Sequence, residues 1–373
     1  MHLVLIGDIG PLDDMIHIGD EAMFDEAVRQ LRRRGVDRIT AISSNPADTA
    51  DRYAVEAVLP LSRGGTALEL GALVADADGV LVTGGGNLSS VWPTHIVERA
   101  TLAGIAAEHV RPFVLSGQTI GPVLTGDGRD TVARMLDSAR LVGLRESTSA
   151  ALVASMGVPA ERAQQTVDDA SFLADGREQP AVVKAAPYAL ITLARHVGDV
   201  DPELAMTAYA SLLDEVAEQT GLELVFHAHF ASMREEDSRG DSAVHDAVAA
   251  RLRTSHVRVA PTTDVPSSAH LARGAALVVS SRYHPAVFAG PGGVPTIGIP
   301  VDQYTDVKLR GALGSFGQSG VLPLTAVLDG RGADTVRRVW DARDATRQRG
   351  IHLAEQTRPV SGAWWDRVLA VFE

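Results

Sequence analysis

The stretch Val278-Val279-Ser280-Ser281-Arg282-Tyr283-His284-Pro285-Ala286-Val287-Phe288 decides the fold prediction, because it predicts a buried strand that turns directly into a helix. The apolar run from Leu277 to Val279 is typical of a strand covered on both faces. Pro285 suits the start of a helix, because its missing N–H costs nothing there. We therefore expect the polar residues between strand and helix to lie at the carboxyl end of a parallel strand, where open α/β sheets bind their ligands.

Arg282 and His284 are the candidate catalytic residues of this stretch. A guanidinium and an imidazole beside the positive end of a helix favour an anionic substrate and a proton that must be moved. Ser281 precedes them and is a candidate substrate ligand. The alternative is that Arg282 forms a salt bridge that only holds the loop in place.

The composition is that of a globular chain long enough for two domains. Its 373 residues are 45% hydrophobic and 22% charged, which is enough for a sizeable core. The formal net charge is -13, from 34 basic and 47 acidic residues. This charge argues against nucleic acid or an anionic membrane as the main partner, because both require broad basic surfaces. An anionic ligand would have to be bound locally by a few arginine, lysine and backbone N–H groups.

The chain contains no cysteine, which excludes disulfides, thiolate nucleophiles and cysteine-ligated metals. Its beginning, Met1 to Asp8, predicts a strand and lacks the basic and apolar segments of a signal peptide. No apolar run approaches the length that a transmembrane helix needs. We therefore expect a cytoplasmic protein without a transmembrane segment, and leave open a peripheral contact with a lipid-linked substrate.

Repeated strand–loop–helix units predict a doubly wound parallel sheet in the first half of the chain. Predicted strands end after Ile6, Val82, Leu115 and Leu144, and small or polar residues follow each of them. Four such strand ends indicate one crevice that is lined by several loops.

Two of these strand ends allow more than one interpretation. The glycine run 84–86 would let backbone amides approach a ligand closely. It is not a GxGxxG dinucleotide motif, and it equally suits a tight crossing of strand and helix. Arg145 is a candidate anion ligand, and its alternative role is a salt bridge with Glu146 or Asp168.

A second series of strands and helices begins at Tyr188 and repeats this architecture without a sequence repeat. His227 and His229 lie at another strand end. Because no acidic residues complete a metal site there, loop or substrate-contact roles are favoured. Tyr304 and Lys308 are four residues apart, so they would share one helix face and reach the crevice of Arg282.

We therefore predict an α/β protein with two Rossmann-like doubly wound domains. The N-terminal domain is expected over residues 1–175, a linker over 176–187 and the C-terminal domain over 188–350. A C-terminal helix over 351–373 is expected to pack across the domains, with one of the adjacent residues Trp364 and Trp365 as its anchor.

A series of short motifs resembles the polysaccharide pyruvyl transferase family in content and in order. The likeness extends from residue 7 to about residue 310. It departs from the family around Met15 to Ile18, where many members carry Asn and Gly, in a loop expected to face the acceptor. The motifs are His17-x-Gly19-Asp20-Glu21-Ala22, Gly84-Gly85-Gly86-Asn87, Ser116-Gly117-Gln118-x-x-Gly121-Pro122, Arg145-Glu146-x-x-Ser149, Asp168-Asp169, Ser281-Arg282-Tyr283-His284 and Asp302-x-Tyr304-x-x-x-Lys308.

The resemblance implies a GT-B-like arrangement, in which two Rossmann-type domains face each other across a cleft. It also implies transfer of the pyruvyl group of phosphoenolpyruvate to a sugar-containing acceptor as a ketal, with release of phosphate and with no metal or further cofactor. Arg282 and His284 would serve the phosphoenolpyruvate side, and the N-terminal domain would serve the acceptor. The candidate substrate ligands are Arg145, Lys308, Tyr304, Ser281, Asp20, Glu21, Gly85, Gly86, Asn87 and Gln118.

Two other functions are compatible with the same residues. A GT-B glycosyltransferase would use the glycine-rich loops and helix N-termini to bind the pyrophosphate of a nucleotide sugar. A non-catalytic protein would bind a sugar or an anion without turnover. The sequence does not name the acceptor, and it leaves the oligomeric state open.

Overall fold

The computed structural model describes residues 1–177, 187–234 and 236–373. These residues form two compact units. The linker expected over 176–187 lies almost entirely outside the described residues. The first unit comprises Met1–Leu12, Asp20–Asp169 and Thr357–Glu373, and the second comprises Asp13–Gly19 and Ala170–Gln356.

A parallel eight-stranded sheet is the framework of the first unit, as far as the structure describes it. Its order is β4-β3-β1-β5-β7-β8-β9, with β6 paired to β7. The chain runs from β1 out to β4, returns to the other side of β1 and continues to β9, so the winding reverses between β1 and β5. The strands are β1 (His2–Ile6), β3 (Arg38–Ile42), β4 (Glu56–Val58), β5 (Gly79–Val82), β6 (Gly85–Leu88), β7 (Phe113–Ile120), β8 (Leu141–Leu144) and β9 (Ala163–Gln165).

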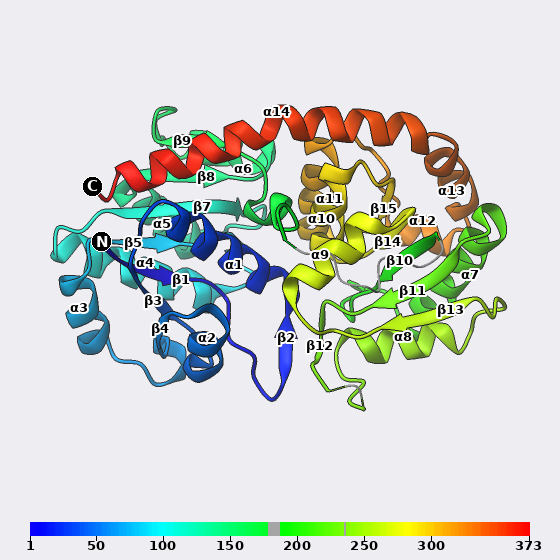
Figure 1. Cartoon of the computed structure of the whole chain (residues 1–373), viewed down its shortest axis with the longest axis horizontal. Coiled ribbons are helices and arrows are strands. Elements are labelled where there is room, and N and C mark those ends of the chain that lie inside the picture. The colour runs from blue at the N-terminus through cyan, green and yellow to red at the C-terminus, as the bar shows by residue number, and fades with distance from the viewer. Residues whose placement is uncertain (178–186, 235) are drawn as a thin grey trace. The chain divides into compact units, whose positions relative to one another are not determined.

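Helices cover both faces of this sheet, which explains why its central strands β1 and β5 are mostly apolar (Figure 1). One core lies under α1 and the end of α14, where Trp364 and Trp365 are 1% and 0% exposed. Full burial of one large apolar side chain contributes about 1.5–3 kcal/mol. The helices are α1 (Ile18–Arg33), α2 (Pro46–Tyr53), α3 (Ala67–Asp76), α4 (Pro93–Glu108), α5 (Gly126–Ser138), α6 (Ser147–Ser155) and, from Thr357 onward, α14 (Arg343–Ala370).

The second unit contains a five-stranded parallel sheet in the order β13-β11-β10-β14-β15. Its winding reverses between β10 and β14, and β14 is the strand of the stretch quoted first. A separate antiparallel pair joins β2 to β12, with Ile16 opposite Ala231. The strands are β2 (Met15–His17), β10 (Tyr188–Thr192), β11 (Glu223–His227), β12 (Phe230–Ser232), β13 (Val257–Ala260), β14 (Leu277–Ser280) and β15 (Thr296–Gly298).

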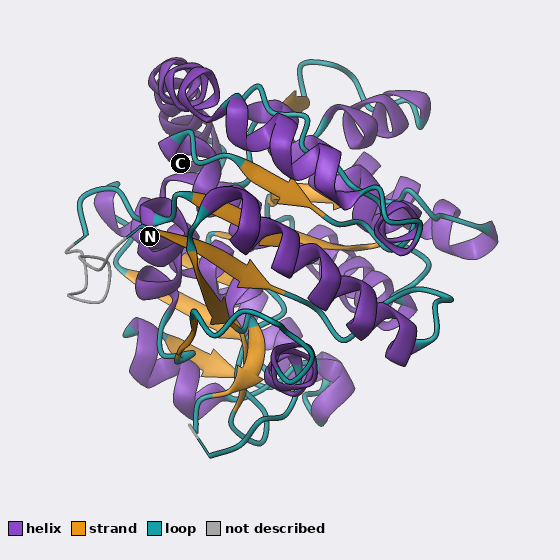
Figure 2. Ribbon diagram, turned by 90° about the vertical axis from the view of Figure 1, so that its right-hand side faces the viewer, coloured by secondary structure: helices purple, strands orange, loops and turns teal. Residues whose placement is uncertain are grey.

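Helices also flank both sides of the second sheet (Figure 2). The core on one face unites α7, α8, α12 and α13 with the strands. On the other face α10 packs against α9, α11 and β14. The helices are α7 (Pro202–Thr220), α8 (Asp241–Ala249), α9 (Val265–Gly274), α10 (Tyr283–Ala289), α11 (Gln303–Ser315), α12 (Leu324–Leu328), α13 (Gly332–Asp341) and the first part of α14.

Several predicted boundaries near the site were wrong. Helix α10 begins at Tyr283, two residues before Pro285, so His284 belongs to its first turn. Strand β7 continues to Ile120, which places Ser116 and Gln118 within the strand and not in a loop after it. For β7, pairing with β6 and β8 extends the strand past small and polar residues that are typical of a strand end.

Other local features were missed or displaced. Residues Gly85–Leu88, expected as a glycine loop, form β6 along β7. The short pair of β2 and β12 was not expected, because neither strand is long enough to give a pattern.

Candidate functional site

A clamped arginine lies at the switch point of the second sheet, between the ends of β10 and β14. Arg282 Nε donates to Asp241 Oδ2 at 2.9 Å, and Nη2 donates to Oδ1 at 2.6 Å. The same carboxylate accepts from the backbone N–H groups of His229 and Phe230, at 3.3 and 2.9 Å. Asp241 is wholly buried, whereas the Arg282 side chain is 23% exposed. The Arg282 guanidinium is therefore bound through Nε and Nη2, which form one edge of the group. Its third nitrogen, Nη1, has no hydrogen-bond acceptor among the described residues.

Asp241 is the functional residue that the sequence analysis missed in this unit. An acidic residue in the first turn of a helix is common, so Asp241 gives no sign in the sequence of an ion pair. Asp241 pairs with an arginine 41 positions away, and this contact arises only when the chain folds. The salt bridge that was the alternative for Arg282 thus exists, but it leaves part of the guanidinium exposed.

His284 packs two residues further on, in the first turn of α10. The side chain is 6% exposed, and its ring lies 5.0 Å from that of Tyr283 and 5.9 Å from that of Phe288. Gly19, in the segment that the second unit takes from the start of α1, lies directly against the imidazole. A Cβ at Gly19 would overlap the ring, so glycine is required there by contact.

Tyr304 and Lys308 share a face of α11, as their spacing predicted. Lys308 Nζ donates to Tyr304 Oη at 3.1 Å. The ammonium lies 4.5 Å from the Tyr304 ring and 5.1 Å from that of Tyr283, the neighbour of His284. Asp302 caps this helix by accepting from Thr305 N at 2.7 Å. A second cation therefore lies beside the first turn of α10, at a defined position.

Three histidines near this switch point, His227, His229 and His245, are buried. Burial lowers the pKa of His227 to about 4 and that of His245 to about 4. Burial lowers the pKa of His229 even further, helped by the charges of other histidines and of Arg282. Neither ring nitrogen of His229 has a hydrogen-bond partner within the described chain, although the residue is 1% exposed. His229 thus offers a neutral donor and a neutral acceptor beside Phe288.

Three predicted substrate ligands are engaged in hydrogen bonds inside their own unit. Ser281 Oγ accepts from Ala194 N at 2.7 Å. Gln118 Nε2 donates to the carbonyl oxygens of Thr83 and Ser116, both at 2.7 Å. Glu21 accepts from Gly10 N and from the Tyr53 hydroxyl, and burial raises its pKa. As substrate ligands these residues stay predictions.

Arg145 forms a buried ion pair, which is the alternative that the sequence left open for it. The residue is 1% exposed, and Nη1 donates to Asp168 Oδ2 at 2.7 Å. Its Nε donates to Thr119 Oγ1 at 2.7 Å and lies 3.9 Å from Glu146 Oε2. This network stabilises the carboxyl ends of β7 and β8, and Arg145 would have to leave it to reach a ligand.

Asp169, next to this network, is a buried acid that is protonated at neutral pH. Burial, and then the charge of Asp168, raises the pKa of Asp169 to about 8. Ser116 Oγ donates to Oδ1 at 3.1 Å and itself accepts from Trp364 Nε1 at 2.8 Å. Oδ2 has no hydrogen-bond partner among the described residues and lies against Gly117.

We expect Asp169→Asn to flatten the pH dependence of stability. The folded-state pKa lies above the ordinary value of 3.8, so the native state binds this proton more tightly than the unfolded state does. Its contribution is complete below about pH 4 and is lost as the pH rises through about 8. Each unit of pKa difference corresponds to about 1.4 kcal/mol. Urea unfolding at pH 5.5, 7 and 8.5 measures the slope.

Asp130, an exposed carboxyl on α5, provides the control for this measurement. Asp130→Asn should keep the decline of the unfolding free energy that the unchanged chain shows between pH 5.5 and 8.5. Equal declines in the Asp169→Asn variant and the unchanged chain would contradict a protonated Asp169.

The switch point of the first sheet holds a further group of polar side chains. Asp8 follows β1, and its Oδ2 lies 3.3 Å from Asn87 Nδ2 and 3.6 Å from His95 Nε2. Asp20, in the first turn of α1, is half-buried. Asn87 was predicted as a ligand, whereas Asp8 and His95 were missed because neither belongs to a recognisable motif.

Gly85 and Gly86 are the first two residues of β6, and Asn87 follows them in the strand. A Cβ on Gly85 would make only an ordinary contact, 3.6 Å from Gln118 Oε1, so packing does not require glycine there. At Gly84 a Cβ would lie 2.7 Å from Met23 Sδ. The tight-crossing interpretation therefore accounts for Gly84 but not for Gly85.

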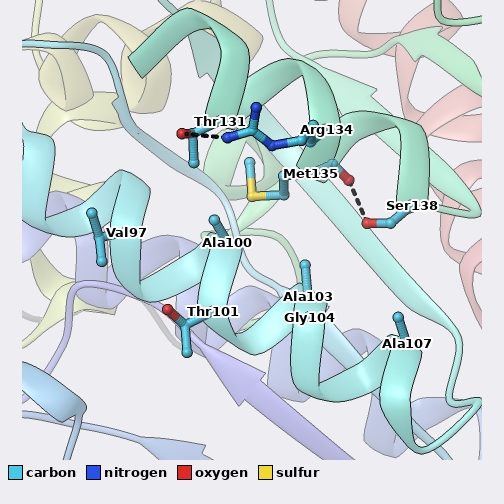
Figure 3. Close-up of a pocket in the computed structure, with 10 residues that line it drawn as sticks. All are labelled: Val97, Ala100, Thr101, Ala103, Gly104, Ala107, Thr131, Arg134, Met135 and Ser138. Atoms are coloured by element: carbon cyan, nitrogen blue, oxygen red, sulfur yellow. Dashed lines mark hydrogen bonds between the residues drawn. The ribbon is translucent and has the colours of Figure 1, made fainter. Parts of the chain in front are cut away.

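A groove of about 390 Å³ lies between α4 and α5 of the first unit (Figure 3). Small and apolar side chains line it, with Arg134 as its charged member. None of the predicted site residues lines this groove. Over the described parts of the chain, no cluster of three histidine or acidic residues is arranged to hold a metal ion. Among these residues no helix is long and apolar enough to cross a membrane.

A family model of polysaccharide pyruvyl transferases matches residues 17–303, well over half of the chain. The chain belongs to the polysaccharide pyruvyl transferase family. The matched region contains the motif residues of both switch points up to Asp302, and it ends before Lys308. A comparison with curated protein sequences gave no significant match.

Solved structures of other sugar-related enzymes share the fold of this family member. A putative UDP-N-acetylglucosamine 2-epimerase from Listeria monocytogenes is 12% identical, with a TM-score of 0.61 and coverage of 99% of this chain and 95% of that one. The UDP-GlcNAc 2-epimerase from Neisseria meningitidis bound to UDP-GlcNAc is 10% identical, with a TM-score of 0.61 and coverage of 98% and 100%. The glycotransferase of kitacinnamycin is 13% identical, with a TM-score of 0.60 and coverage of 99% and 98%. The predicted GT-B-type fold is thereby confirmed.

Proposed function

We propose that this pyruvyl transferase family member moves the pyruvyl group of phosphoenolpyruvate onto two hydroxyls of a sugar-containing acceptor and releases phosphate. The observation that carries the proposal is the clamped Arg282, with His284 and Lys308 in its neighbourhood, at the switch point of the second sheet. On a chain of net charge -13, these local cations supply the attraction that a carboxylate and a phosphate need. The second unit would bind the donor, and the first unit would bind the acceptor.

The reaction needs an acid and a base but no redox step. Protonation of the methylene carbon of phosphoenolpyruvate makes C2 electrophilic, and a first acceptor hydroxyl adds to C2 and loses its proton. The C2–O bond to phosphate then breaks, a second hydroxyl adds to C2 and loses its proton, and the ketal and inorganic phosphate remain. His284 is the proposed proton donor, because an imidazole exchanges protons near neutral pH. Arg282 would bind the carboxylate or phosphate through its exposed edge.

A nucleotide-sugar reaction is the second candidate, and one observation favours it. The structural neighbour from Neisseria meningitidis binds UDP-GlcNAc, and its fold covers nearly all of this chain. A switch point with a clamped arginine would also suit a pyrophosphate. The two candidates differ in what they release, because pyruvyl transfer frees inorganic phosphate and glycosyl transfer frees a nucleotide.

Product release therefore tests the proposal. The purified chain is mixed with phosphoenolpyruvate or with UDP-GlcNAc, together with p-nitrophenyl glycosides of glucose, galactose, mannose and N-acetylglucosamine. We expect acceptor-dependent phosphate from phosphoenolpyruvate and an acceptor mass increase of one pyruvyl ketal. Release of UDP without phosphate would favour the second candidate, and binding of phosphoenolpyruvate without any product would favour a non-catalytic anion-binding protein.

A further inference from the structure

Asp8 occupies the position in the first unit at which a doubly wound sheet binds its ligand. Strands β1 and β5 are adjacent and parallel, with Ile6 opposite Val82, and the chain leaves them in opposite directions. Asp8 follows β1 by two residues, and Asn87 follows β5 within β6. The carboxyl ends of such strands form the crevice in which open α/β sheets hold ligands.

The Asp8 carboxylate is held through one oxygen and open at the other. Both neighbours, Asn87 Nδ2 at 3.3 Å and His95 Nε2 at 3.6 Å, lie on Oδ2. Oδ1 has no hydrogen-bond partner among the residues that the structure describes, and the Asp8 side chain is 43% exposed. An anchored carboxylate with one open oxygen has the geometry of a proton acceptor for a bound hydroxyl.

Arg99 fixes the orientation of His95. Arg99 is 3% exposed and forms no ion pair with a described carboxylate; its Nη1 instead contacts His95 Nδ1 at 3.2 Å and His95 O at 3.4 Å. A guanidinium only donates, so Nδ1 accepts and the ring proton of a neutral His95 is on Nε2, which faces Asp8. Burial lowers the pKa of His95, against the opposing charge of Asp8, which favours this neutral form. Burying an arginine without a carboxylate partner costs folding free energy. We therefore expect its contacts with His95 to serve the function of the site.

An exposed aromatic ring completes the group. Trp92 precedes α4, is 45% exposed and lies 6.4 Å from the His95 ring in an edge arrangement. Its neighbour Val91 is 48% exposed. A large ring that stays in solvent beside a polar crevice suits a ligand with both apolar faces and hydroxyl groups, as a pyranose ring has.

We propose that this group is the acceptor subsite: Trp92 supports a sugar ring, and Asp8 is the general base that takes the proton from its attacking hydroxyl. The inference rests on the proposed function. As the acceptor oxygen forms its bond to C2 of the donor, the O–H bond breaks and the proton passes to Asp8 Oδ1. Asn87 and His95 are positioning residues that hold Oδ2, and Arg99 positions His95.

Substitutions at three residues, Asp8, Trp92 and His95, test the subsite with phosphoenolpyruvate and the four p-nitrophenyl glycosides. Asp8→Asn should lower kcat by about 100-fold or more, since general base catalysis contributes about 100- to 10,000-fold. It should leave the dissociation constant of phosphoenolpyruvate, measured by calorimetry, within threefold. Trp92→Ala should raise KM for the glycoside with little change in kcat.

The test of His95 needs a measurement that would stay unchanged if His95 only supported the fold. His95→Ala should lower kcat and leave the glycoside KM unchanged, and His95→Gln, which keeps a donor toward Asp8, should recover most of the loss. If both variants lose activity equally, together with their melting temperature, His95 does not position Asp8. Asp51→Asn, an exposed carboxyl on α2, and Leu68→Ala, an exposed apolar residue on α3, are the controls and should match the unchanged chain.

The outcomes separate this inference from the proposed function. If the unchanged chain releases phosphate and Asp8→Asn does so within threefold of it, the base assignment is overturned and the proposed function stands. If the unchanged chain releases no phosphate with any of the glycosides, the proposed function and the base assignment fall together.

Discussion

Replacement of His284 by Ala is expected to lower phosphoenolpyruvate turnover by about 100- to 10,000-fold, the usual contribution of a general acid. The ring lies in the first turn of α10 and is surrounded by Tyr283, Phe288 and Gly19. Its removal takes away the proposed proton donor and leaves the Arg282–Asp241 pair in place. Acceptor-dependent phosphate release gives the rate, and thermal unfolding shows whether the fold persists.

Two further variants make the His284 result decisive. His256→Ala, which removes an exposed histidine of the same unit, should keep full turnover. Gly19→Ala keeps the imidazole but places a methyl group where the ring now lies, so it should lower turnover by displacing His284. Normal turnover in His284→Ala would remove this residue from the mechanism. Full activity in Gly19→Ala would mean that the ring position is not critical.

The sequence predicted the framework of both sheets because buried parallel strands leave a pattern of their own. The apolar runs of β1, β5 and β14 end at or within one residue of the positions expected from the sequence. Elements without such a pattern were missed. Strands β2 and β12 have three residues each and are defined by pairing with each other, across more than 200 positions of sequence.

The sequence supplied candidate residues for the site but not the contacts between them. The motif around Arg282 and His284 lies at a switch point, and Tyr304 and Lys308 share a helix face, as their spacing predicted. No local pattern could reveal that Asp241 clamps Arg282, because the two are joined only by folding. The same holds in the first unit, where Asp8, His95 and Arg99 meet through the order of the strands and carry no motif that names them.

The Arg145 network shows a different limit of sequence reasoning. An arginine at a strand end next to Glu146 is compatible with ligand binding and with internal pairing alike, and the choice depends on burial. Arg145 is 1% exposed and bonded to Asp168 and Thr119, whereas Arg282 is 23% exposed with one side of its fork open. Of the two strand-end arginines, Arg282 therefore has the geometry of a ligand-binding group.

Asp241→Ala is expected to cost about 3–5 kcal/mol of unfolding free energy, the usual effect of removing one partner from a buried ion pair. The carboxylate is wholly buried and satisfies both donors of the Arg282 edge and two backbone N–H groups. Its loss would leave all four donors without an acceptor. Urea unfolding measures the effect, and Asp246→Ala, on the same helix but without a role in this pair, is the matched control.

Arg282→Lys then separates the two roles of the arginine, because lysine keeps the charge but cannot form the fork. If Arg282 only holds the loop, the variant should lose stability and still bind phosphoenolpyruvate with unchanged affinity. If its open edge binds the donor, affinity should fall tenfold or more while the unfolding free energy falls far less than in Asp241→Ala. Calorimetric titration with phosphoenolpyruvate, beside urea unfolding of both variants, distinguishes these outcomes. We expect the second, because the clamp engages only Nε and Nη2 and leaves Nη1 without an acceptor among the described residues, on a side chain that is 23% exposed.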